Sequence, residues 1–488
     1  MKKKSTLKLL LSLLFILSLT AVSAVPVLTM SVRATGTGNT FYYYLTITNT
    51  GTGGYAIDKA SNLVVTAVVP TGASFVSANL GGVLSGNTIT WRINNLAGSL
   101  AGGSSGKVTP TFAVTTNAAG GTAITLVAAT TGVNCTEDAT IRRPAADITK
   151  TVTAASAVIE ISATGNDATA AANLVTNADG SKSTAAAFPY RSWVSAMALV
   201  RTNNTKFQTV KFRPGTYTDA QNDIQSTSAS VNLNASGRAF AGLVVDGQGS
   251  LLDGIGSTSN FFNISNESLI SDITFKNIIF SSFNDVGSGN YNVASFTDVD
   301  GLVIENCTFY SSQTRQPIAI NFTNLRPMFV TISNCVFSGN SRNTETSSSG
   351  AMEVVGNGTQ TAANGVTVNI NNTFFSCNRR NSDGGALKLY GSSNDGRATT
   401  FNISNSIFKG NESSTLGSGG AAIYIGDASS NSSFSNLNIY KTDFIENVLT
   451  GSTSAGGISV FSGKQIVNIN GGLFNRNGYN GASGNKGG

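Results

Sequence analysis

The sequence of 488 residues contains no histidine, and this absence excludes several common site chemistries. A catalytic dyad or triad that uses an imidazole base has no residue to supply it. There are only four cysteines, and no two of them have the close spacing of metal ligands. We therefore expect no metal and no cofactor. The cysteines are Cys135, Cys307, Cys335 and Cys377.

Charged residues are also scarce, at 11% of the chain against about 25% in an average protein. Four of the 31 Lys and Arg residues lie in the first eight positions, which leaves 27 against 25 Asp and Glu. A nearly neutral chain without a basic cluster does not favour nucleic acid as a partner. The 53 glycines and the abundant Ser, Thr and Asn are typical of a secreted β-protein rich in turns.

The one long apolar run lies at the N-terminus. Four lysines precede the run Leu9–Leu19, and Val22-Ser23-Ala24 matches a small-residue cleavage site, so residues 1–24 are predicted to be a secretory signal peptide. A membrane anchor is the alternative, but the run is shorter than the ~20 residues that span a bilayer. We therefore expect an extracellular or cell-surface protein whose mature chain has no transmembrane segment.

Residues 27–143 contain short alternating segments separated by Gly, Asn and Pro, which predict a two-sheet β-sandwich. The expected strands are Phe41–Asn49, Asn62–Val69, Thr88–Ile93, Val108–Thr115 and Ala123–Thr130. The stretches FYYYLTITNTG, NLVVTAVVPTGASFVSA and NTITWRINNLAG resemble the conserved-repeat β-sandwich of bacterial and archaeal surface proteins. That resemblance implies that residues 27–143 are an Ig-like β-sandwich that serves as a stalk or spacer without catalytic residues.

Residues 144–157 are expected to be a linker, and residues 158–488 a right-handed parallel β-helix. An apolar face at helical spacing in Pro189–Val200 predicts a short amphipathic helix that covers the open end of the stacked sheet. Residues 158–218 are therefore assigned to a capping region and residues 219–488 to the coils. The segments PGTYT and LVVDGQGSLLDG are similar to the N-terminal part of secreted parallel β-helix proteins.

A phenylalanine that recurs every 28 to 38 residues predicts the coils. Apolar residues stand five and seven positions before it, and an asparagine stands three before it in five copies. Strand side chains alternate, so the asparagine must form a corner that returns the phenylalanine to the interior; Asn tolerates the left-handed conformation needed there. We expect the stacked asparagines to form a hydrogen-bonded ladder. The positions are Phe280, Phe309, Phe337, Phe375, Phe408, Phe444 and Phe474, with Asn277, Asn306, Asn334, Asn372 and Asn405.

Cys307 and Cys335 occupy equivalent positions in adjacent coils, two residues before the phenylalanine. Stacked cysteines could form a disulfide in an oxidising compartment. Two buried free thiols in an apolar stack are the alternative, and the sequence leaves both open.

After the phenylalanine, the pattern Phe-x-x-Asn precedes a variable loop and a Gly-Gly-Ala-like element, with four such pairs between about residues 300 and 488. This order resembles the repeat of chlamydial polymorphic membrane proteins, which implies a surface β-helix passenger that acts in adhesion. Proteins of that family carry a C-terminal membrane β-barrel. The printed sequence stops at Gly487-Gly488, where another Gly-Gly-Ala element is due, so we expect a longer reading frame.

A polysaccharide-cleaving β-helix would need clustered carboxylates. The best cluster is Asp298 and Asp300, and solvated turn acids are the simpler interpretation. Other charged candidates are Glu305, Arg315 and Arg326 near that pair, and Asp246 and Asp253 at a glycine-rich corner. The outward-facing positions of successive Gly-Gly-Ala strands form a column in which no residue type repeats. They are Glu353, Lys388, Tyr424 and Ser459. We assign no catalytic, cofactor-binding or metal-binding residue.

These observations predict a non-enzymatic, adhesin-like protein whose partners are glycans or components of host or neighbouring cell surfaces. A polysaccharide lyase or glycoside hydrolase of the pectate-lyase-like β-helix superfamily is one alternative. A structural cell-envelope protein is another.

Overall fold

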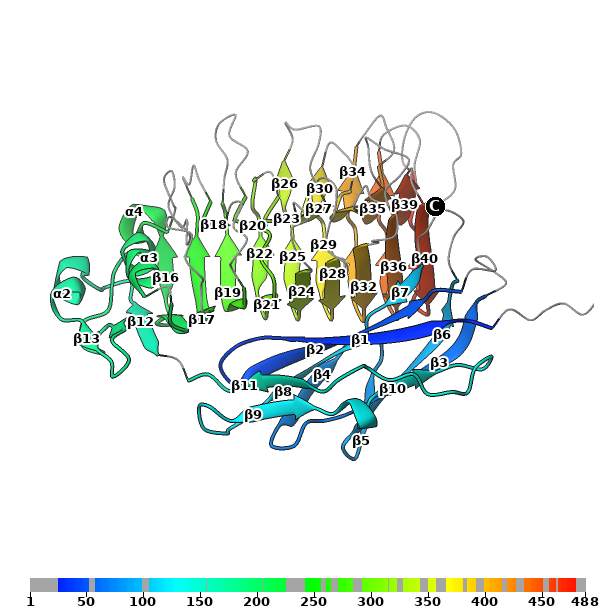
Figure 1. The fold of residues 1–488 in the computed structure, drawn as a ribbon. Coiled ribbons are helices and arrows are strands. Elements are labelled where there is room, and N and C mark those ends of the chain that lie inside the picture. Colours follow the sequence, from blue (N-terminus) through cyan, green and yellow to red (C-terminus); the bar gives the residue numbers. More distant parts are fainter. Residues whose placement is uncertain are drawn as a thin grey trace, which may run out of the picture.

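The computed structural model contains two all-β parts that lie side by side, a long parallel β-helix and a β-sandwich packed along its flank (Figure 1). The structure describes residues 25–51, 58–98, 105–154, 156–203, 205–224, 242–255, 260–264, 271–283, 292–314, 316–322, 328–342, 350–356, 366–380, 384–391, 399–414, 419–426, 434–450, 456–461 and 464–479. The expected signal peptide, residues 1–24, lies outside these ranges. Among the described residues, no helix has both the length and the apolar character needed to cross a membrane.

Two antiparallel sheets form the sandwich, as the sequence predicts. One sheet contains β1 (Leu28–Thr35), β2 (Thr40–Asn49), β4 (Ser74–Ala78), β7 (Gly106–Val108) and β8 (Thr111–Thr115). The other contains β3 (Ala60–Val68), β5 (Val83–Ser85), β6 (Thr88–Leu96) and β10 (Gly132–Asn134). Phe41, Tyr43, Trp91 and Phe112 fill the space between the sheets.

The C-terminal part of the sandwich differs in detail from the sequence prediction. The strand expected over Ala123–Thr130 ends early, because β9 spans Ala123–Leu126 and a 3-10 turn covers Ala128–Thr130. β9 pairs with β11 (Ile148–Thr151), a strand inside the segment expected to be a linker. Backbone pairing therefore holds part of this connection against the sandwich.

Three parallel sheets form the β-helix, which confirms the predicted fold. The longest has 17 strands: β12 (Ala157–Ile161), β15 (Gln208–Phe212), β16 (Thr216–Thr218), β17 (Leu243–Asp253), β19 (Ile273–Ser281), β21 (Leu302–Glu305), β22 (Thr308–Tyr310), β24 (Met328–Ser333), β25 (Val336–Ser338), β28 (Val366–Asn371), β29 (Phe374–Ser376), β32 (Thr399–Ser404), β33 (Ile407–Lys409), β36 (Phe434–Tyr440), β37 (Asp443–Ile445), β40 (Lys464–Asn470) and β41 (Phe474–Asn475). The second contains β18 (Phe262–Ile264), β20 (Ala294–Thr297), β23 (Ile318–Phe322), β27 (Met352–Gly356), β31 (Leu387–Tyr390), β35 (Ile423–Gly426) and β39 (Ile458–Phe461). The third contains β26 (Ser341–Arg342), β30 (Arg379–Arg380), β34 (Glu412–Ser413), β38 (Val448–Leu449) and β42 (Gly478–Tyr479).

The recurring phenylalanines stack inside the β-helix as the sequence predicts. From Phe280 to Phe474, successive ring centroids lie 4.7 to 5.0 Å apart, at interplanar angles of 4 to 15°. This spacing matches the ~4.8 Å separation of paired strands, so each coil places its ring directly above the ring of the coil before it.

The corner asparagines adopt the expected left-handed conformation, with φ between +49 and +57°. Lys441 and Gly471 have positive φ at the same corner in the last two copies. The exposed ladder forms only in pieces: Asn306 donates to Asn277 (3.3 Å) and Asn372 donates to Asn334 (2.6 Å). Asn405 donates to Asn371 instead of to a corner asparagine.

A second asparagine ladder, which was not expected from the sequence, is formed by the asparagines of the Phe-x-x-Asn elements and is buried along most of its length. Each side-chain amide donates to the same residue of the next coil, with N···O distances of 2.7 to 2.9 Å. Each amide also donates to a phenylalanine carbonyl of the preceding coil. This buried ladder consists of Asn340, Asn378, Asn411, Asn447 and Asn477.

The N-terminal end of the β-helix is covered by helices, as predicted (Figure 1). α3 (Trp193–Thr202) buries Trp193, whose ring stacks on Phe261 at a centroid distance of 4.4 Å. Two further short helices were not expected, α2 (Asp167–Ala172) and α4 (Asp219–Asn222). The parallel stacking already begins at β12, within the segment assigned to the cap.

All four cysteines are free thiols in the structure, and only Cys377 is exposed. Burial raises the pKa of Cys335 to about 12 and raises the pKa of Cys307 well above its ordinary value. Both thiols donate to backbone carbonyls of the preceding coil. The structure therefore favours the buried-thiol alternative.

Thiol labelling tests this arrangement. With an aromatic disulfide reagent at pH 8, we expect the native protein to react through Cys377 alone, because the thiolate is the nucleophile and the other thiols are buried. After denaturation without reductant, all four cysteines should react. Reaction of only two after denaturation would show that one pair of cysteines is bonded and would contradict the arrangement of free thiols.

Replacement of a central rung tests the buried ladder. Asn378→Ala removes the donated bonds to Phe337 and Asn411 and leaves Asn340 without its acceptor, so we expect a loss of about 2–4 kcal/mol of unfolding free energy. Asn372→Gly is the control, since it removes an exposed rung but keeps the positive φ, and should cost under about 1 kcal/mol. Urea denaturation followed by circular dichroism measures both, and equal losses would contradict a special role for the buried ladder.

Candidate functional site

The sandwich packs on one outer face of the β-helix, named here the docking face, which is formed by β19, β21, β24, β28, β32, β36 and β40 (Figure 1). The five-stranded sheet makes most of this contact, and β6 of the other sheet contacts β40. Side chains of β2 point alternately into the sandwich and onto this face. Tyr43 lies in the sandwich core, whereas Tyr42 and Tyr44 pack with Val303 and Phe329 of the β-helix. Burial on both sides explains why Phe41–Leu45 is an uninterrupted apolar and aromatic run.

Two of the acids that the sequence singled out, Asp300 and Glu305, lie in this contact rather than in solvent. Asp300 is 4% exposed, forms an ion pair with Arg33 of the sandwich and accepts the backbone N–H of Phe329. Asp298 is also buried, at 1% exposure. Glu305 accepts the hydroxyl of Tyr42 at 3.1 Å. The interpretation of Asp298 and Asp300 as solvated turn acids is therefore replaced by one in which Asp300 joins the two parts of the protein.

The remaining predicted charged positions have separate roles. Asp253 accepts the backbone N–H of Ile255, as expected of a turn former. Arg315 and Arg326 lie outside the described residues. The structure therefore brings Asp300 and Glu305 to the same domain contact but pairs them with sandwich residues.

A further acid at the contact was missed in the sequence. Asp272 accepts the backbone N–H of Gly36 at 2.7 Å and lies 3.6 Å from the ammonium of Lys150. Burial raises the pKa of Asp272, against the opposing effect of Lys150. Gly301 fits here because a Cβ would come 2.7 Å from a carboxylate oxygen of Asp272.

A third asparagine ladder runs along the docking face and holds the sandwich. Its rungs bond to each other at 2.8 to 2.9 Å and are Asn369, Asn402, Asn438 and Asn468. Asn79 of the sandwich donates to Asn369, which donates to Thr111. The signal was present in the sequence, because an Asn precedes the inward Ile by one residue in each of these four coils.

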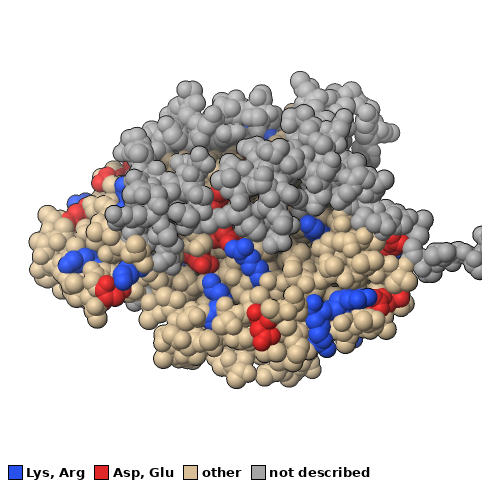
Figure 2. All heavy atoms as spheres, viewed as in Figure 1, with Lys and Arg blue, Asp and Glu red and all other residues tan. Residues whose placement is uncertain are grey.

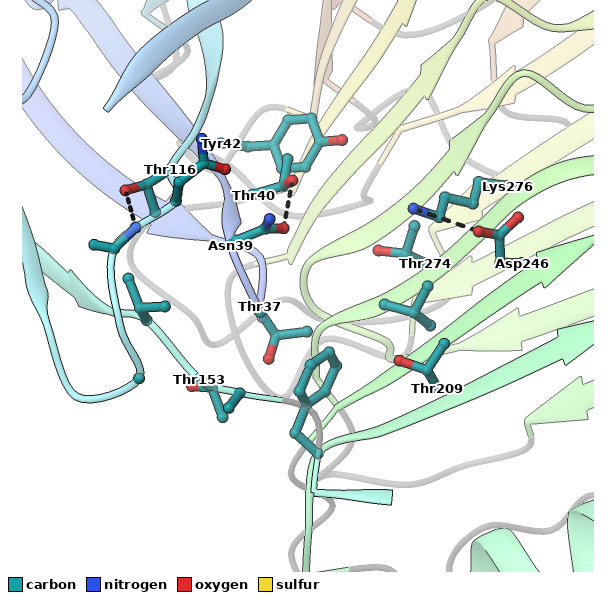
Figure 3. A pocket seen from close by; sticks show the side chains of 18 of the residues that line it. Thr37, Asn39, Thr40, Tyr42, Thr116, Thr153, Thr209, Asp246, Thr274 and Lys276 are labelled. Atoms are coloured by element: carbon teal, nitrogen blue, oxygen red, sulfur yellow. Dashed lines mark hydrogen bonds and ion pairs between the residues drawn. The ribbon is translucent and has the colours of Figure 1, made fainter. Parts of the chain in front are cut away.

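The ladder ends at Asn369 on the side of the capping helices. Farther toward those helices, the sandwich and the β-helix separate and leave a polar cleft of about 540 Å³ (Figure 3). Thr37, Asn39 and Thr153 line the sandwich side, and Thr209 and Thr274 lie opposite them on the β-helix. Thr209 and Thr274 belong to one outward row, because β15 and β19 both pair with β17 in register.

A second outward row in the cleft carries alternating charge. In strand order, it consists of Lys211, Asp246, Lys276 and Glu305. Asp246 lies 3.7 Å from the ammonium of Lys276 and accepts the side-chain amide of Asn277, so its carboxylate is already engaged. Lys211 makes no ion pair with any residue that the structure describes.

The column of the Gly-Gly-Ala strands does not form a contact surface. Glu353, Lys388 and Tyr424 are each 6% exposed or less. Lys388 pairs with Glu353 at 3.7 Å, and Gln316 donates to Glu353 at 2.9 Å. Neighbouring groups therefore cover these three side chains, whereas Ser459 is half-buried.

The described surface carries few charges. On the face shown in Figure 2, acidic and basic side chains lie singly or in small mixed groups among uncharged residues. Within the described ranges, no three His, Cys, Asp or Glu side chains are arranged to hold a metal ion.

Comparison with known protein families finds no match, and comparison with curated proteins finds none. Among solved structures, the chain is similar to the catalytic domain of a GH87 alpha-1,3-glucanase in complex with tetrasaccharides. The identity is 11% and the TM-score 0.26, with 92% of this chain and 98% of that chain covered. A similarity this low carries no argument about the present chain.

Replacement of Arg33 tests whether its ion pair with Asp300 helps to hold the sandwich on the β-helix. Arg33→Ala leaves the buried carboxylate of Asp300 without its partner and removes the guanidinium from the ring of Phe329. Because Arg33 itself is partly exposed, we expect a loss of about 1–3 kcal/mol and faster proteolysis at the 144–157 segment. Calorimetry and limited proteolysis measure the two effects. Arg142→Ala breaks an exposed pair with Asp138 and is the control; an equal effect of both variants would contradict the role of Arg33.

Proposed function

We propose that the protein is a secreted or cell-surface, adhesin-like binding protein without enzymatic activity. The observation that carries this proposal is the docking of the sandwich on the outer face of the long sheet, which engages Asp300 and Glu305 with Arg33 and Tyr42. Glycoside hydrolysis needs two carboxyl groups that flank a substrate. Asp300 and Glu305, two of the acids that the sequence favoured for such chemistry, are instead bonded to another part of the same chain.

Rigidity supports a display role. The β-helix has a continuous stack of phenylalanine rings and a buried amide ladder, both of which fix one coil on the next. The sandwich bonds to several successive coils through Asn369, Asn402 and Asn438. The two parts therefore present one firm surface rather than a mobile pair, which lowers the entropy lost when a partner binds.

We propose glycans, or other components of host or neighbouring cell surfaces, as the partners. The cleft at the domain junction offers hydroxyl groups from both parts and side-chain amides from the sandwich, which suits the hydroxyl-rich surface of a saccharide. The resemblance of the repeats to chlamydial polymorphic membrane proteins and the expected export signal agree with a place at the cell surface or outside the cell.

The purified full chain allows a direct test against glycan arrays and intact cells. We expect saturable binding to a subset of glycans or cells that is lost when the protein is heat-denatured. Incubation with polysaccharides, with and without calcium, should release no reducing ends and no unsaturated products. Depolymerisation that Asp300→Asn or Glu305→Gln abolishes would make the protein an enzyme. Absence of binding to every surface would favour the structural cell-envelope alternative.

A further inference from the structure

We propose that the cleft at the domain junction binds a short acidic saccharide, whose anionic group pairs with the ammonium of Lys211. This inference rests on the proposed binding function and names the ligand class of its site. Three observations support it: the size and lining of the cleft, the pairing of the charged side chains on its β-helix side, and the apolar side chains that also line it.

The size and polarity of the cleft fit a small polar ligand. Its volume of about 540 Å³ lies within the roughly 300–1,000 Å³ of typical ligand pockets. Hydroxyl groups converge from both sides, with Thr37 and Thr153 on the sandwich and Thr209 and Thr274 on the β-helix (Figure 3). Hydroxyls both donate and accept hydrogen bonds, as saccharide hydroxyls require.

Among the described charged side chains that line the β-helix side of the cleft, Lys211 is the one left to bind a ligand. The carboxylate of Asp246 forms an ion pair with Lys276 at 3.7 Å and accepts hydrogen bonds from Asn277 and from the backbone N–H of Gln248. At the far end of the row, Glu305 accepts the hydroxyl of Tyr42. Lys211 stands beside Asp246 in register but forms no ion pair with the described residues. An anionic group that enters the cleft would supply that partner.

The position of Lys211 increases the strength of such a pair. Its side chain is partly buried between the two parts of the protein, where an ion pair is less screened than on an open surface. Phe207, Val152 and Val244 also line the cleft and offer apolar contact for the C–H faces of a sugar ring. Polar and apolar lining in one cleft matches the mixed surface of a saccharide.

Calorimetric titration of the full chain tests the proposal with paired ligands. The acidic probes are 3′-sialyllactose and 3′-sulfolactose, each compared with lactose, and trigalacturonate, compared with galactotriose. We expect at least one acidic probe to bind about tenfold more tightly than its neutral counterpart. The two lactose derivatives distinguish a carboxylate from a sulfate. The preference should weaken as salt is raised.

Three variants assign the preference to the cleft. Lys211→Met should remove the roughly tenfold difference between acidic and neutral probes, and Lys211→Arg should retain most of it. Thr274→Val removes a hydroxyl from the cleft and should weaken both kinds of probe alike. Lys409→Met, at an exposed lysine on β33 outside the cleft, is the control and should change nothing. Circular dichroism confirms that each variant is folded.

The outcomes separate this inference from the proposed function. Equal binding of acidic and neutral probes, or a preference that survives in Lys211→Met, overturns the role of Lys211. If the full chain binds cells or glycan arrays but none of the acidic probes, the cleft inference fails while the binding function stands. If it binds neither, both fail.

Discussion

Each buried asparagine of the Phe-x-x-Asn elements hydrogen-bonds both to the same residue one coil away and to a phenylalanine carbonyl of the preceding coil, and these directional bonds favour one register of the coils. The amide of Asn378 bonds to Asn411 on one side and accepts from Asn340 on the other. A shift of one residue would leave each buried donor and acceptor unpaired, which costs more than the bonds contribute. The phenylalanine stack alone is less specific, because apolar contact is not directional.

The same chemistry extends outward to the sandwich. On the docking face, Asn369 lies in a ladder of its own and exchanges hydrogen bonds with Asn79 and Thr111. A row of amides at strand spacing can form hydrogen bonds with the backbone and side chains of a second sheet without a large apolar interface. Arg33 and Asp300 add an ion pair at one position in this contact. The cleft then arises where the sandwich turns away from the sheet, so its shape depends on the docking.

Much of the fold could be predicted from repeats, whereas the site could not. The spacing of Phe337, Phe375 and Phe408 predicts their stacking, and the helix near Trp193 follows from its apolar face. The cleft joins Thr37 to Thr209 and Lys211, which belong to different folding units. No sequence periodicity relates these residues, because the repeat spacing of the β-helix and the strand alternation of the sandwich each reflect packing inside one unit only.

The sequence by itself determined the parallel coils, the left-handed corner at residues such as Asn334, and the two-sheet sandwich, because strand alternation and repeat spacing are local properties of the chain. Only the tertiary structure decided that Asp300 is buried, that Glu353 and Lys388 are covered, and that Lys211 faces a cleft. Burial and pairing of a side chain depend on what packs against its strand, and in this protein that neighbour comes from a distant part of the chain.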